Sequence, residues 1–130
     1  MSGIIQMKHD ADPKQEIMKE LGDLSEIEIF NNEVLVAIYI RPEKTKGGIL
    51  LTATTRKEDT YQSKVGLVIK AGNSAFEEDG KWFRGVSVQV GDWVLFRPSD
   101  GYEMQVGERR VRLFPDTAIR GKVLNPDLIW

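Results

Sequence analysis

The sequence has no cysteine and only one histidine, and this scarcity excludes much catalytic and metal chemistry. Without cysteine there are no disulfides, no thiolate nucleophile and no zinc–thiolate centre. The one histidine, His9, lies in a polar stretch with no suitable partner residue placed nearby, so we expect an exposed side chain. We therefore expect no catalytic residue, no metal site and no cofactor, and we predict that the protein is not an enzyme.

Long apolar runs and an excess of one charge are also missing. No apolar run approaches the ~20 residues that a membrane helix needs, and the first residues lack the basic and apolar regions of a secretory signal. The 18 basic and 20 acidic residues give a net charge of -2, which provides no general attraction to phosphate backbones. We expect one soluble, cytoplasmic domain that binds neither nucleic acid nor a membrane.

A short helix is predicted near the N-terminus. Asp12 can cap a helix, Pro13 suits its first position, and Gly22 would end it after about nine residues. Its apolar residues share one face: Ile17, Met18 and Leu21. A helix this short does not persist alone in water, so it must dock on something or fray. We assign residues 1–30 to an N-terminal appendage that carries this helix.

After the helix, the pattern is typical of β structure. Short runs rich in branched and aromatic residues are closed by glycine, proline or aspartate. The runs are IEIFNNEVLVAIYI, VGLVIKAG, VSVQVGDWVLF, YEMQV and RRVRLF, with a closing strand near residues 119–124. Many short strands joined by tight turns predict an all-β fold, a small barrel or sandwich. We assign residues 31–124 to this domain and residues 125–130 to a C-terminal tail.

A hairpin is predicted at about residues 73–86. Asp79-Gly80 is a strong signal for a tight hairpin turn. Three aromatic residues flank it: Phe76, Trp82 and Phe83. We interpret these rings as aromatic side chains that pack against one another across the two strands of the hairpin. We interpret the acidic residues beside the turn as a solvent-exposed tip.

Three arginines near the C-terminus raise the question of nucleic-acid binding. Strand alternation places Arg109 on the face opposite Arg110 and Arg112, and no row of stacking aromatics accompanies them. We therefore expect these arginines to form surface or inter-subunit ion pairs.

The segment 41–64 stands apart from the β pattern. It is far longer than a usual connection, carries six basic and three acidic side chains, and holds one apolar triplet, Ile49-Leu50-Leu51, after Gly47-Gly48. From composition alone, two readings stay open. The triplet is either a short strand folded back onto the barrel or an apolar hook on a mobile arm.

A resemblance to a known family bears on this choice. In order and approximate spacing, five stretches resemble the GroES-type co-chaperonins, the small ring-forming lids of bacterial chaperonins, over about residues 33–124. The stretches are Gly47-Gly48-Ile49-Leu50-Leu51-Thr52, Gly66-Leu67-Val68, Ala71-Gly72-Asn73, Val90-Gly91-Asp92-Trp93-Val94-Leu95-Phe96 and Gly101-Tyr102.

The resemblance implies a GroES-like small, partly open β-barrel with a long mobile loop at 41–64 and a roof hairpin at 73–86. It implies that Gly47 and Gly48 let the arm bend, and that Ile49, Leu50 and Leu51 enter an apolar groove of a GroEL-type chaperonin. It also implies a homo-oligomeric ring of seven subunits that assists protein folding without catalysis.

Two departures from the family keep a second function open. Leu50 stands where the family usually has valine, and some thirty residues precede the first strand. The alternative is a structural or assembly protein built on the same barrel, for example a viral capsid-associated subunit. The expected location is the cytoplasm of a bacterial cell or of a virus-infected host cell.

Overall fold

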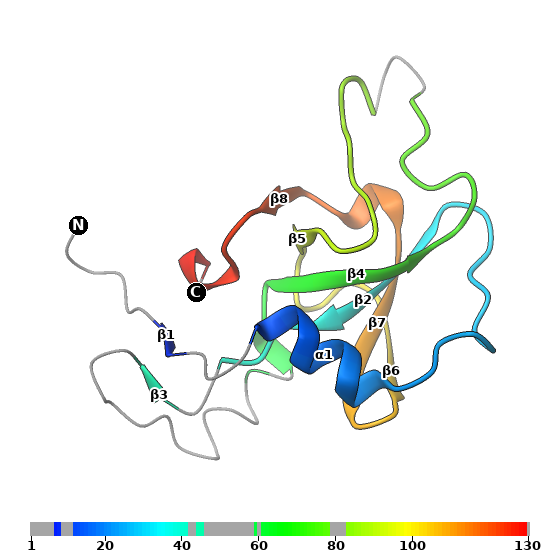
Figure 1. The fold of residues 1–130 in the computed structure, drawn as a ribbon. Helices are drawn as coiled ribbons and strands as arrows, with labels where there is room; N and C mark the ends of the chain where they lie inside the picture. The colour runs from blue at the N-terminus through cyan, green and yellow to red at the C-terminus, as the bar shows by residue number, and fades with distance from the viewer. Residues whose placement is uncertain are drawn as a thin grey trace.

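The computed structural model describes residues 7–8, 12–41, 44–45, 59, 61–78 and 83–129. Its centre is a six-stranded antiparallel sheet with the strand order β6-β7-β2-β4-β5-β8 (Figure 1). The strands of this sheet are β2 Glu33–Ile38, β4 Val65–Ala71, β5 Trp93–Leu95, β6 Tyr102–Val106, β7 Arg109–Pro115 and β8 Gly121–Val123. Two further short strands, β1 Met7–Lys8 and β3 Lys44–Thr45, pair only with each other.

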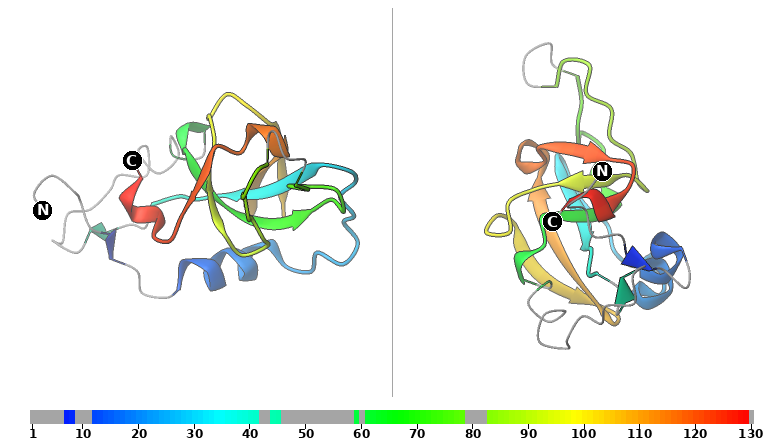
Figure 2. Two further views of the ribbon diagram at one scale, coloured as in Figure 1. Left: turned by 90° about the horizontal axis from the view of Figure 1, so that it is seen from above. Right: turned by 90° about the vertical axis from the view of Figure 1, so that its left-hand side faces the viewer.

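The sheet curls but does not close. Its outer strands, β6 and β8, are not paired with each other in the part of the chain that the structure describes. Helix α1, Pro13–Leu21, lies along one side of the sheet (Figure 2). Two 3₁₀ turns follow β7 and β8, at η1 Asp116–Ala118 and η2 Pro126–Leu128. The prediction of an all-β, partly open barrel with a short N-terminal helix is confirmed.

The two central strands are buried on both faces, as their nearly continuous apolar sequences require. Along β2, alternate side chains enter two separate apolar clusters. Leu35, Ala37 and Tyr39 belong to the first cluster, which also contains residues of α1. Val34, Val36 and Ile38 belong to the second cluster, together with Phe96 and Phe114.

Gly66 allows β4 to approach β2 closely. A Cβ atom at this position would lie 2.5 Å from Val36 Cγ1 and 2.6 Å from the Ala37 carbonyl oxygen. Neither contact is possible for a real side chain, and one of them is with backbone. Glycine is therefore required here for packing rather than for a turn.

Helix α1 has the bounds that the sequence predicts. The Asp12 side chain caps it by accepting a hydrogen bond from the Lys14 backbone N–H at 3.1 Å. At the other end Gly22, at φ 76°, donates its N–H to the Met18 carbonyl at 3.3 Å. These capping contacts explain why the helix begins and ends where it does.

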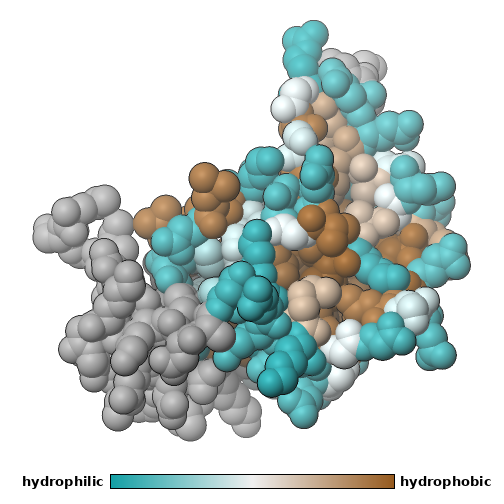
Figure 3. Space-filling view, viewed as in Figure 1, coloured by the Kyte–Doolittle hydropathy of each residue, from teal (hydrophilic) through white to brown (hydrophobic). Residues whose placement is uncertain are grey.

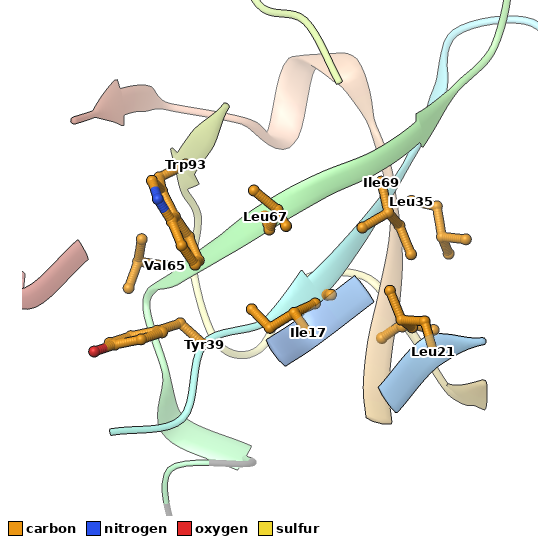
Figure 4. Close-up of a cluster of buried hydrophobic side chains, with 10 residues drawn as sticks. Ile17, Leu21, Leu35, Tyr39, Val65, Leu67, Ile69 and Trp93 are labelled. Atoms are coloured by element: carbon orange, nitrogen blue, oxygen red, sulfur yellow. The ribbon is translucent and has the colours of Figure 1, made fainter. Parts of the chain in front are cut away.

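The helix docks on the barrel and completes the first cluster. Ile17 and Leu21 are 1% and 3% exposed and point toward the sheet (Figure 4). Met18 was predicted to share their face, but it is 41% exposed. It follows Ile17 directly, and successive helical residues point about 100° apart, so it turns away from the sheet. The outward surface of α1 is mostly hydrophilic (Figure 3).

Polar contacts fasten the C-terminal end of α1 to the β6–β7 turn. The Glu20 carboxylate forms an ion pair with Arg109 at 2.7 Å, and the Glu20 carbonyl accepts the Glu108 N–H at 3.0 Å. Gly107 has φ 57°, and a Cβ atom there would lie 2.4 Å from the Glu20 carbonyl oxygen. The turn therefore accommodates the helix only because residue 107 is glycine.

Two runs that were predicted as strands are not strands. Residues 27–30 run along the outside of the sheet, where Ile27 and Ile29 pack partly against the first cluster and the Ile27 carbonyl accepts Lys70 Nζ at 2.6 Å. Residues 86–90 form no ladder, and Val86 and Val90 are 43% and 60% exposed. Both runs have β-forming residues, but neither pairs with a strand among the described residues.

The predicted roof hairpin falls partly outside the described residues, which omit 79–82 and therefore Asp79, Gly80 and Trp82. Phe76 and Phe83 do meet, edge to face, with ring centroids 5.7 Å apart. The buried Asp116 carboxylate supports this region, because it accepts hydrogen bonds from the Phe76 N–H at 3.0 Å and from Asn32 Nδ2 at 3.1 Å. A groove of about 360 Å³ lies beside the two phenylalanine rings and is lined by residues that include Phe76, Phe83, Val86 and Ile119.

Candidate functional site

The predicted partner-binding residues Gly47, Gly48, Ile49, Leu50 and Leu51 lie outside the described residues. The structure does describe both ends of the segment 41–64 that carries them. One end follows β2, and the other leads into β4. The described part of the candidate site is therefore the base of this segment.

Arg41 and Asp59 join the two ends of the segment. Asp59 Oδ1 accepts Arg41 Nη2 at 2.8 Å, and Oδ2 accepts Arg41 Nε at 3.0 Å and the Arg41 backbone N–H at 3.1 Å. The Asp59 side chain is 2% exposed and that of Arg41 is 17% exposed. A two-pronged, largely buried pair of this kind fixes both distance and orientation. We call it the base clamp.

The residues after Asp59 continue this ordered base into the sheet. Asp59, Tyr61 and Gln62 are helical, and the Asp59 carbonyl accepts the Ser63 N–H at 3.0 Å. The Ser63 hydroxyl, itself buried, donates to the Val65 carbonyl at 3.0 Å. The base clamp is thus attached directly to the start of β4.

Arginines of β7 hold the same region from another side. Arg112, which is buried, donates to the Tyr61 carbonyl at 3.1 Å and approaches Glu103 at 3.7 Å. The Arg110 guanidinium lies 5.4 Å from the centre of the Tyr61 ring, a cation–π distance. Arg109 points to the opposite face, toward α1. The predicted alternation of the three arginines is confirmed. Arg109 and Arg112 form ion pairs within the chain, and their side chains are largely buried rather than at the surface, because α1 and Tyr61 cover them.

Tyr39 connects the base to the C-terminal turn η2. Its hydroxyl hydrogen-bonds to the Asp127 carboxylate, and its ring meets Trp93 edge to face at 5.4 Å. Burial raises the pKa of Tyr39, and the hydrogen bond to Asp127 raises it further. Ile129 also packs partly against the first cluster, so the described C-terminal residues dock on their own barrel.

The segment 41–64 also contains a short strand, which the sequence pattern did not indicate. Lys44–Thr45 pairs antiparallel with Met7–Lys8, with Met7 opposite Thr45 and Lys8 opposite Lys44. The N-terminal appendage therefore reaches the segment that carries the apolar triplet. Whether residues 49–51 form a strand on the barrel stays a prediction, because they lie outside the described residues.

The base has the geometry of an anchor. Its buried carboxylate, Asp59, accepts three hydrogen bonds, all from Arg41. Across the described ranges, no three histidine, cysteine, aspartate or glutamate residues are grouped so that they could hold a metal ion. No described helix is long and apolar enough to cross a membrane. What the arrangement can do is hold the two ends of one long segment together.

Sequence reasoning missed the base clamp and the role of Tyr61. Arg41 and Asp59 were counted only among the charges that solvate the segment. They are 18 positions apart, and no local spacing rule links an arginine to an aspartate at that separation. The pairing depends on β2 and β4 lying side by side, which only the fold provides.

Comparison with known proteins identifies the chain. The family described as "Chaperonin 10 Kd subunit" matches residues 26–123. This chain belongs to that co-chaperonin family. It is 37% identical to the 10 kDa mitochondrial chaperonin of Arabidopsis thaliana over 90 residues, 69% of this chain and 86% of the relative. It is 32% identical to the co-chaperonin GroES of Pelagibacter ubique over 91 residues, 70% of this chain and 90% of the relative.

The co-chaperonin match also delimits what is additional in this chain. Family membership confirms the resemblance read from the sequence and supports a co-chaperone role. The matched region begins at residue 26, after α1 has ended at Leu21. Strand β1 and helix α1 therefore lie outside the part of the chain that the family describes, although α1 contributes to the barrel's first cluster.

Proposed function

We propose that this co-chaperonin caps a GroEL-type chaperonin through Ile49, Leu50 and Leu51, on a mobile arm whose ends the base clamp holds together. The observation that carries the proposal is the position of the triplet relative to the clamp. Seven residues, 42–48, separate it from Arg41, and seven, 52–58, separate it from Asp59. An arm pinned at Arg41 and Asp59 carries its apolar residues at the midpoint, where the reach is greatest.

The energetics favour a weak single arm. Burying three large aliphatic side chains is worth about 1.5–3 kcal/mol each, or roughly 5–9 kcal/mol in all. Ordering about ten arm residues costs on the order of 10 kcal/mol in backbone entropy. One arm therefore does not hold a partner strongly without added main-chain hydrogen bonds. Gly47 and Gly48 allow the close backbone approach that such bonds need.

Several arms acting together overcome this limit. In a closed ring, once one arm is bound the others bind at high effective concentration, which raises affinity by ~10²-fold or more. We propose a homo-oligomeric ring, with seven subunits as the resemblance implies. Weak individual arms also allow release when the chaperonin changes shape with its nucleotide.

The proposed role is mechanical rather than catalytic and needs no cofactor. Residues 31–124 would form the barrel domain, residues 1–30 the appendage and residues 125–130 the tail. We propose the bacterial cytoplasm as the location, and the mitochondrial name of the Arabidopsis relative makes an organelle the alternative. The two relatives named above are a chaperonin and a co-chaperonin, so they lend no support to a capsid-associated role.

The direct test is capture by a purified bacterial GroEL-type chaperonin with and without nucleotide. We expect Leu50→Asp to abolish nucleotide-dependent capture while circular dichroism and ring size stay unchanged. Thr54→Asp places the same charge in the same segment outside the triplet, and it should retain capture. Equal capture by wild type and Leu50→Asp would contradict the proposal. Sedimentation of the wild type tests the ring separately, and a monomer at micromolar concentration would overturn that part.

A further inference from the structure

The N-terminal residues that the family does not include are held to the molecule at two places. The first is helix α1, which inserts Ile17 and Leu21 into the first cluster and pairs Glu20 with Arg109. The second is β1, which pairs with β3. Four residues, 9–12, connect β1 to α1, so the firmly docked helix keeps β1 close to its partner strand.

The partner strand β3 belongs to the root of the proposed arm. Only two residues, 42 and 43, separate it from Arg41 in the base clamp. Figures 1 and 2 show β1 and β3 side by side and apart from the six-stranded sheet. The pairing therefore holds Lys44–Thr45 away from the barrel.

We propose that the N-terminal extension is a strap that positions the arm, with α1 as its anchor and β1 as the strand that holds the arm's root outward. This proposal rests on the proposed function. Ile49 lies eight positions beyond Arg41 but only four beyond Thr45. With β3 held, the stretch of chain between the last fixed residue and the triplet is about half as long as it would be if it began at Arg41. This stretch also begins at a point outside the barrel.

Such a strap favours binding for an entropic reason. Residues fixed before the partner arrives do not have to be ordered when it binds. A shorter connecting stretch also confines the triplet to a smaller volume, which raises its effective concentration at the groove of the chaperonin. A strap that had to open before binding would instead lower the affinity for the partner. Whether the affinity falls or rises when the strap is removed therefore distinguishes the two roles.

The strap itself can be tested without any partner. Deleting residues 2–11 removes β1 but keeps Asp12, the cap of α1. Successive pairs of an antiparallel ladder alternate in hydrogen bonding, so one amide of β3, that of Lys44 or of Thr45, donates to β1. In hydrogen exchange, we expect that amide to exchange faster in the deletion variant, whereas amides of β2 and β4 should be unchanged. Equal exchange of Lys44 and Thr45 in the two proteins would overturn the strap, whatever the chaperonin does.

Its effect on binding can be tested in one protein with a redox switch. The chain has no cysteine, so Met7→Cys with Thr45→Cys creates a single pair. Directly opposed residues of an antiparallel ladder have Cα atoms about 4.5–5.5 Å apart, within the ~4.4–6.8 Å that a disulfide spans. Oxidation locks the strap, and reduction frees it.

We expect the oxidised protein to bind a GroEL-type chaperonin at least as tightly as its reduced form, and the deletion variant to bind about tenfold more weakly per arm. Loss of capture on oxidation, or full affinity in the deletion variant, would overturn the positioning role. In either of these outcomes the wild-type protein still binds the chaperonin. If the proposed function itself is wrong, the wild-type protein does not bind either, so the two failures can be told apart.

Discussion

Arg41 and Asp59 form a bidentate, largely buried ion pair between the end of β2 and the residues that lead into β4. The pair closes the base of the segment between these two residues. The described part of that segment, Lys44–Thr45, pairs with β1 in a separate two-stranded sheet. The contribution of the ion pair is to fix where the segment leaves and re-enters the barrel.

Removing the acid of this pair should destabilise the protein. Asp59→Asn leaves the Arg41 guanidinium partly buried without its counter-charge, and we expect the free energy of unfolding to fall by about 3 kcal/mol. Urea denaturation followed by tryptophan fluorescence measures this loss. Glu28→Gln, which neutralises an exposed acid, should change the free energy by less than about 0.5 kcal/mol. Equal stability of the two variants would show that the clamp is not formed in solution.

Adjacent residues of α1 should respond differently to truncation. Ile17 is 1% exposed and Met18 is 41% exposed. Ile17→Ala should lower the free energy of unfolding by about 2–5 kcal/mol, because it removes buried apolar atoms and leaves a cavity. Met18→Ala should have an effect of less than about 1 kcal/mol. If both variants unfold at the same urea concentration as the wild type, the helix is not docked.

A glycine pair tests the close packing of β4 on β2. Gly66→Ala places a Cβ atom 2.6 Å from the Ala37 carbonyl oxygen, and we expect a loss of about 1–3 kcal/mol as the strands shift. Gly121→Ala in β8 meets only Leu95 Cδ1, at 3.4 Å, and should be tolerated. Thermal unfolding by calorimetry distinguishes them. A Gly66→Ala variant as stable as Gly121→Ala would contradict the register of β2 and β4.

Tyr39 should make stability depend on pH in alkaline solution. Its pKa in the folded protein is raised by burial and by Asp127, above the value of about 10 in an unfolded chain. Its contribution is therefore fully present below pH ~10 and is lost as the pH rises above it, because the unfolded state releases the proton first. Between pH 9 and 11, the free energy of unfolding should fall more steeply for wild type than for Tyr39→Phe. Parallel curves would mean that Tyr39 is not buried against Asp127.

The sequence predicted elements whose signals are local. The cap at Asp12, the stop at Gly22 and the unbroken apolar run of β2 each reflect nearby residues, and the structure agrees with them. Predictions that needed a partner strand were less successful. Residues 27–30 and 86–90 have strand-forming side chains, but they pair with none of the described strands. The base clamp and the β1–β3 pair join distant segments, and no periodicity in the sequence indicates such contacts.

The contact between Gly107 and Glu20 has a consequence for protein engineering. Because the turn has space for the helix only without a side chain at residue 107, α1 is not a module that can be grafted alone onto another barrel. A recipient scaffold would need a glycine in the corresponding hairpin and an arginine two residues later to receive the incoming glutamate. Helix and hairpin would have to be transplanted as one unit.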